Sequence, residues 1–231
     1  MFNRKELVSL LIAALVIGYV YALQNLSLLG FLAMAGLALI MLFIHHLGQK
    51  FTALFYDCSI EFRLWTIRQF WLKKGGHFKF DFPAGVIIPV FLAILTLPFI
   101  VVKWLSLTTF DAIPLPARVQ RKYAELTEFD LALIAVGGLF FNAVLAVISQ
   151  AFGWNDFAMM NLCFIAFNLL PISTLDGSKI FFGSVMLWVF SVVFTAIMLI
   201  LIGNASVITT IIAAVILAFA AVVLYYVSTP A

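Results

Sequence analysis

Long apolar stretches alternate with short polar connections along most of this chain. A bilayer core requires about 20 mostly apolar residues per helix. Six stretches are predicted to be membrane-spanning helices: residues 7–23, 26–44, 129–152, 157–172, 180–202 and 205–227. The second stretch follows the first at once, and no small-residue cleavage site separates them. The first is therefore expected to be a retained span and not a cleaved signal peptide.

A polar region at residues 49–128 encloses a further apolar block at residues 82–105. That block is long enough to cross a bilayer, yet it contains Pro83, Pro89 and Pro98. Proline removes a backbone donor and kinks or breaks a helix, so a re-entrant or interfacial segment is predicted here. The predicted fold is an all-α polytopic membrane protein, with about six transmembrane helices plus this segment, in a single membrane domain.

The composition agrees with a membrane protein. Hydrophobic residues make up 65% of the chain and charged residues 10%, whereas soluble domains are about half apolar and a quarter charged. The basic residues lie mostly beside the predicted spans, which indicates contact with lipid head groups and no nucleic-acid partner. Cys58 and Cys163 form no CxxC pair, and we interpret both as packing residues.

The charge pattern also predicts the orientation in the membrane. Arg4 and Lys5 precede the first predicted span, which places the N-terminus in the cytoplasm by the positive-inside rule. Basic residues after the second span agree: Lys50, Arg63, Arg68, Lys73, Lys74 and Lys79. If residues 82–105 make no net crossing, six spans return the chain to its starting side. We therefore expect a multi-pass protein of the cell membrane with both termini in the cytoplasm.

Two polar motifs interrupt the apolar pattern. Residues 44–50, IHHLGQK, place His45 and His46 at the end of the second predicted span. Residues 168–177, NLLPISTLDG, contain Asp176 after another apolar run. Ionisable residues at membrane depth are costly and are functional candidates by default.

These motifs resemble those of the site-2 protease family of intramembrane zinc metalloproteases. NLLPISTLDG is similar to the family's NxxPxxxLDG, and GLFFN at residues 138–142 is similar to its AGPxxN helix, with Gly138 and Asn142 retained. Residues 55–65 are similar to the archaeal branch in particular. The resemblance implies a family-like core over about residues 26–180, with a polar, partly re-entrant insertion at residues 50–128 and additional C-terminal spans at residues 180–227. It also implies that Asp176 is a metal ligand, and that IHHLGQK stands where the family has HExxH.

The HExxH element is altered in this chain. Residues at i and i+4 share a helix face, which lets two imidazoles bind one zinc ion beside the glutamate base. His45 keeps the first ligand position, but His46 occupies the general-base position and Gln49 the second ligand position. No catalytic residue is therefore assigned, and His45 and Asp176 are residual candidate ligands for zinc.

Simpler interpretations of these residues stay open. His45 could bond to Asp176 without a metal, and His46 could be an interfacial group satisfied by head groups or water. Asp176 could be a turn residue before Gly177. His77, in a Gly-Gly-His loop, could fold back towards the motif, but nothing in the sequence places it there.

The leading functional hypothesis is a pseudoprotease, a proteolytically inactive homologue that binds or regulates a membrane client. Its partner would be a transmembrane segment of a client protein or an active paralogue. The residues expected to line a client groove are Asn142, Asn168, Pro171 and Gly177. Two alternatives remain: an active intramembrane zinc metalloprotease with an altered ligand set, and a transporter or ion pathway through His45, His46 and Asp176. The absence of inverted hydropathy repeats disfavours the transporter.

Overall fold

The computed structural model describes residues 2–23, 27–69, 77–96, 103–115 and 126–229. Over these residues the chain is mostly helical, with eight helices, which confirms the helical fold class. Contacts divide the chain into two compact units. Unit 1 comprises Met1–Phe43 with Glu61–Asp111, and unit 2 comprises Ile44–Ile60 with Ala112–Ala231. The single membrane domain stays a prediction.

Unit 1 is built on α1 (Arg4–Ala22), which packs against α3 (Ala84–Thr96). The first half of α2 (Leu28–Phe55) also belongs to this unit. A Cβ at Gly18 of α1 would lie 2.7 Å from the Cβ of Ala35 in α2, so the two helices approach closely where both side chains are small. Small residues at such contacts are typical of packed membrane helices.

Four short strands lie in the polar region, and the sequence analysis did not predict them. β1 (Cys58–Leu64) pairs with β4 (Thr108–Pro114), and β2 (Ile67–Gln69) pairs antiparallel with β3 (His77–Phe82). The side chains of β1 are alternately more and less buried, which is the period of two that a strand with one covered face requires. The all-α description is therefore incomplete, although helices dominate.

The described part of the apolar block at residues 82–105 contains one helix, α3. α3 has 13 residues with Pro89 inside it, so it is only about 20 Å long, against about 30 Å for the hydrocarbon core. Pro98 lies outside the described residues, as do Lys73 and Lys74 of the predicted basic segment. Whether the block is re-entrant or interfacial stays a prediction.

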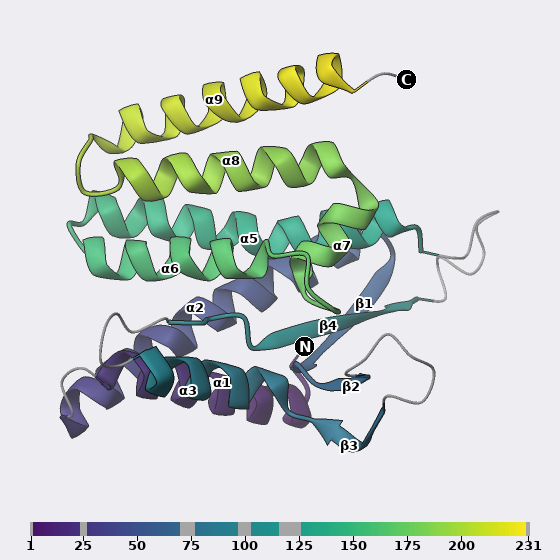
Figure 1. The fold of residues 1–231 in the computed structure, drawn as a ribbon, viewed down its shortest axis with the longest axis vertical. Helices are drawn as coiled ribbons and strands as arrows, with labels where there is room; N and C mark the ends of the chain where they lie inside the picture. Colours follow the sequence, from purple (N-terminus) through teal and green to yellow (C-terminus); the bar gives the residue numbers. More distant parts are fainter. Residues whose placement is uncertain (1, 24–26, 70–76, 97–102, 116–125, 230–231) are drawn as a thin grey trace. The chain divides into compact units, whose positions relative to one another are not determined.

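Unit 2 contains five helices: α5 (Glu128–Ala151), α6 (Asn155–Asn168), α7 (Asp176–Gly183), α8 (Val185–Leu201) and α9 (Val207–Ser228). In Figure 1, α8 lies between α9 and the layer of α6 and α5, and α7 packs against α5 and α8. The second half of α2, from Ile44, also belongs to this unit.

Two helix ends in unit 2 differ from the sequence prediction. The apolar run at residues 157–172 stops being helical at Asn168, because Pro171 disfavours helical geometry in the residue before it. The run at residues 180–202 is split at Ser184, which has an extended backbone, and its Oγ accepts a hydrogen bond from Leu187 N at 3.2 Å. Ser184 thereby caps α8, and the predicted single helix is in fact α7 followed by α8.

Within the described residues, four helices are long and apolar enough to cross a membrane: α1, α2, α5 and α9. α6 and α8, with 14 and 17 residues, are shorter. The structure thus agrees with a membrane protein, whereas the count of six spans is not confirmed.

Candidate functional site

The altered motif lies inside a helix. The predicted span ends at residue 44, but α2 continues without a break to Phe55. His45 and Gln49 are therefore one helical turn apart and share a face, as the i and i+4 positions require. His45, His46 and Gln49 are each only 1% exposed. His46 is thus buried, and it is not an exposed group facing lipid head groups or water.

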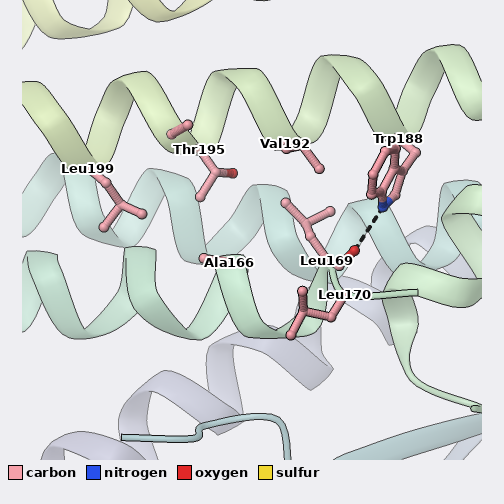
Figure 2. A pocket seen from close by; sticks show the side chains of 8 residues that line it. Ala166, Leu169, Leu170, Trp188, Val192, Thr195 and Leu199 are labelled. Carbon is pink, nitrogen blue, oxygen red and sulfur yellow. Dashed lines mark hydrogen bonds between the residues drawn. The ribbon is translucent and has the colours of Figure 1, made fainter. Parts of the chain in front are cut away.

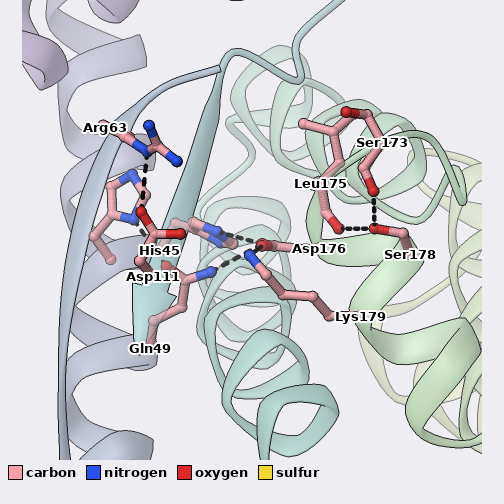
Figure 3. A network of polar contacts seen from close by, with 10 residues as sticks. His45, Gln49, Arg63, Asp111, Ser173, Leu175, Asp176, Ser178 and Lys179 are labelled. Atoms are coloured by element: carbon pink, nitrogen blue, oxygen red, sulfur yellow. Dashed lines mark hydrogen bonds and ion pairs between the residues drawn. The ribbon is translucent and has the colours of Figure 1, made fainter. Parts of the chain in front are cut away.

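Asp176 meets this face of α2 although it lies 131 positions from His45. Its carboxylate oxygen Oδ2 is 3.0 Å from His45 Nε2 and accepts a hydrogen bond from Gln49 Nε2 at 2.9 Å (Figure 3). Asp176 is the first residue of α7 and is 2% exposed, so it is not a surface turn residue. The structure brings together His45 and Asp176, the two candidate ligands, and the substituted residue Gln49.

His46 contacts Gln49, its neighbour on α2. Its Nδ1 lies 2.9 Å from Gln49 Oε1. The amide oxygen can only accept, so the imidazole nitrogen is the donor. We call His45, His46, Gln49 and Asp176 the polar cluster.

Lys179 adds a positive charge that the sequence analysis did not single out. Its Nζ lies 4.0 Å from Asp176 Oδ1, and the Lys179 side chain is 15% exposed. The sequence spacing of Asp176 and Lys179 could have indicated this contact, because residues three apart on a helix are neighbours.

Gly138 of α5 gives the polar cluster the space it occupies. A Cβ at this position would lie 2.6 Å from Gln49 Cγ and 2.7 Å from His45 Cε1. At Gly48, on the same segment of α2, a Cβ would lie 2.8 Å from Gly137 O. Glycines on both helices therefore allow α2 and α5 to approach, which gives Gly138 of the GLFFN motif a packing role.

The LDG turn is held by equally close contacts. A Cβ at Gly177 would lie against the carbonyl groups of Leu169 and Leu170, so this position has no room for a side chain. Ser178 Oγ is 2.7 Å from the carbonyl oxygens of both Ser173 and Leu175, to which it can donate (Figure 3). These contacts determine where α7 begins and hence where the Asp176 carboxylate lies.

The predicted groove residues have different surroundings. Asn142 is buried and donates from Nδ2 to Asn161 Oδ1 at 3.2 Å, a bond between α5 and α6 that the sequence analysis missed. Asn168 is also buried and donates to Phe164 O at 2.9 Å within its own helix. Pro171 is exposed. The client groove stays a prediction, and the His77 side chain lies outside the described part.

An apolar pocket of about 310 Å³ adjoins the end of α6 (Figure 2). Leu169 and Leu170 line it on one side and Val192 and Leu199 of α8 on the other. Trp188 Nε1 donates to Leu169 O at 2.8 Å and ties α8 to the backbone just after Asn168.

The donor set does not fit a catalytic zinc site, which uses three protein ligands. Within the described ranges, no three His, Cys, Asp or Glu side chains are placed to hold a metal ion. Gln49 faces Asp176 with its amide Nε2, which donates a hydrogen bond and offers no lone pair to a metal ion.

Comparisons with protein-family models, curated proteins and solved structures find no match. The resemblance to the site-2 protease family therefore depends on the motifs alone.

Proposed function

We propose that this chain is a site-2 protease-like membrane protein without proteolytic activity, which binds or regulates a transmembrane segment of another protein. The observation that carries the proposal is the hydrogen bond from Gln49 Nε2 to Asp176 Oδ2, at 2.9 Å. In the family resemblance, Gln49 stands at a ligand position. In this chain the Gln49 amide instead donates a hydrogen bond to the carboxylate of Asp176, the residue at another ligand position of the family.

The general base is the second missing element. Metal-assisted peptide hydrolysis needs an activated water molecule and a group that takes its proton. His46 stands at the base position, and its Nδ1 is bonded to Gln49 Oε1 at 2.9 Å. That nitrogen carries the proton that it donates to Gln49, so it cannot take a proton from water.

The exposed segment after α6 supports a binding role. Leu170, Pro171 and Ile172 are exposed apolar residues in irregular backbone between two helices of unit 2. Non-helical backbone at membrane depth is tolerated where protein covers it, and proline lacks the backbone donor that would otherwise need a partner. We propose that a client segment packs against residues 170–172.

A cleavage assay tests the loss of proteolysis. The full-length protein in proteoliposomes is incubated with a reporter that carries one transmembrane segment, with zinc or with a chelator. The wild type is expected to give no chelator-sensitive product. The double variant His46→Glu with Gln49→His, which restores the motif, is expected to gain zinc-dependent cleavage, whereas His46→Glu alone gains none. Chelator-sensitive cleavage by the wild type would refute the proposal.

Photo-crosslinking tests the binding role in native membranes. A photoreactive amino acid at Ile172 is expected to give a discrete protein adduct. The matched control is Ile216 in α9, which is 60% exposed on a candidate membrane span and should give lipid adducts only. If Ile172 gives the same adducts as Ile216, residues 170–172 do not contact a client.

A further inference from the structure

The two departures from HExxH contact each other. His46 and Gln49 are three positions apart on α2, and His46 Nδ1 lies 2.9 Å from Gln49 Oε1. Independent decay of an unused motif gives no reason for the two new side chains to be partners. Their contact suggests that they work as a pair.

The direction of each hydrogen bond shows what the pair does. His46 donates to Gln49 Oε1, which leaves Gln49 Nε2 on the opposite side of the amide, where it donates to Asp176 Oδ2. A glutamate at position 46 would present only acceptors to the amide oxygen. It would favour the reversed amide, which would turn an oxygen towards the Asp176 carboxylate. His46 is therefore matched to Gln49 and not to a zinc ligand.

The carboxylate of Asp176 needs such donors. It is 2% exposed, and a buried charge is costly unless it is paired or hydrogen-bonded. Oδ2 has two nitrogen partners, from His45 and Gln49, and Lys179 Nζ lies 4.0 Å from Oδ1. In a metalloprotease site the ion supplies this positive potential.

We propose that His46 and Gln49 replace a metal ion: His46 orients the Gln49 amide, and the amide together with His45 holds Asp176, joining α2 to α7 without metal. His46 is thus a positioning residue that acts through Gln49. This role does not depend on whether the chain binds a client, and it explains how the LDG turn keeps its place after a ligand is lost.

Thermal unfolding of the purified full-length protein in lipid nanodiscs tests metal independence. The wild-type Tm is expected to stay the same, within about 1 °C, when a chelator or zinc is added, because His45 and Gln49 contact Asp176 directly without an ion. Gln49→His offers two imidazoles and one carboxylate, and its Tm should rise with added zinc and fall again with chelator. A wild-type Tm that falls by several degrees in chelator would overturn the proposal.

A matched pair of variants at position 46 tests the positioning role. His46→Gln and His46→Glu have nearly the same shape, but only the glutamine amide can donate to Gln49 Oε1. We expect His46→Glu to lower the Tm by at least about 3 °C more than His46→Gln does. In the Gln49→Leu background this difference should shrink, because the amide that His46 orients is gone. Equal Tm values for the two variants, or an unchanged difference in that background, would show that His46 is only a space-filling residue.

Discussion

At the scale of single residues, the polar cluster depends on a neighbouring glycine that has no side chain as much as on its own hydrogen bonds. His45 and Gln49 fit between α2 and α5 only because position 138 has no side chain. Buried polar groups are expensive to displace from their partners, since each lost hydrogen bond leaves an unsatisfied group. A single methyl group at Gly138 should therefore disturb both residues at once.

Gly138→Ala is expected to destabilise the protein by about 1–3 kcal/mol, because its Cβ would overlap Gln49 Cγ and His45 Cε1. Unfolding of the purified protein by SDS titration measures the effect. Gly36→Ala is the control, since Gly36 is also a glycine inside a long helix, α2, and a Cβ there meets nothing within 4 Å. The control should be neutral or stabilising by up to about 1 kcal/mol. Equal losses in both variants would contradict the packing described for Gly138.

The sequence predicted part of this site. The resemblance placed His45, Gln49 and Asp176 on one site, and the structure brings their side chains within hydrogen-bonding distance. The bond between His46 and Gln49 was not predicted, because two helical residues three apart can touch only in certain rotamers, which no residue pattern reveals. The bond from Asn142 to Asn161 depends on the rotation of α5 and α6 about their own axes. The apolar pattern of these two helices does not predict that rotation.

At the scale of elements, the apolar pattern located the long helices but not their interruptions. Residues 7–23 correspond closely to α1, and residues 129–152 to α5. Ser184 lies between apolar residues, and hydropathy cannot show that its hydroxyl caps α8 instead of lying inside one helix. The strands were missed because seven residues such as Cys58–Leu64 give only a weak alternating signal.

The break after α6 is held by a bond between elements. Trp188 Nε1 donates to Leu169 O, so α8 holds the backbone just before Pro171 (Figure 2). Trp188→Phe keeps an aromatic ring beside Phe181 but removes this donor, and should cost about 0.5–1.5 kcal/mol. SDS titration again gives the measurement. Trp154→Phe, at a residue that is 63% exposed, is the control and should change stability by less than about 0.5 kcal/mol. A loss that is no larger at Trp188 than at Trp154 would mean that the bond contributes nothing measurable.

At the scale of the whole molecule, the contact between His45 and Asp176 restricts the number of membrane crossings, in addition to helix length. Asp176 must reach the same side of the membrane as His45, because their side chains are bonded. From Leu28 to His45, α2 rises about 26 Å, so a bilayer core about 30 Å thick that begins near Leu28 would have its far boundary near His45. An even number of crossings between the two motifs satisfies this condition. α5 and α6 supply two, provided that α6 spans despite its 14 residues and that α3 does not cross.

The predicted topology can be tested by labelling single cysteines in intact cells, in a background where Cys58 and Cys163 are replaced by alanine. We expect a membrane-impermeant maleimide to label Asn155→Cys and Asn204→Cys, which lie at the α5–α6 and α8–α9 connections. Asn3→Cys and Ser228→Cys, at the start of α1 and the end of α9, should react only after permeabilisation. The expectation follows from the positive-inside rule, which predicts that Arg4 and Lys5 keep the N-terminus in the cytoplasm, and from the predicted six crossings, which would return the end of α9 to that side. Labelling of Asn3→Cys and Ser228→Cys from opposite sides would require an odd number of crossings. Labelling of Asn155→Cys only after permeabilisation, with Asn3→Cys also protected, would mean that α3 crosses the membrane or that α5 does not.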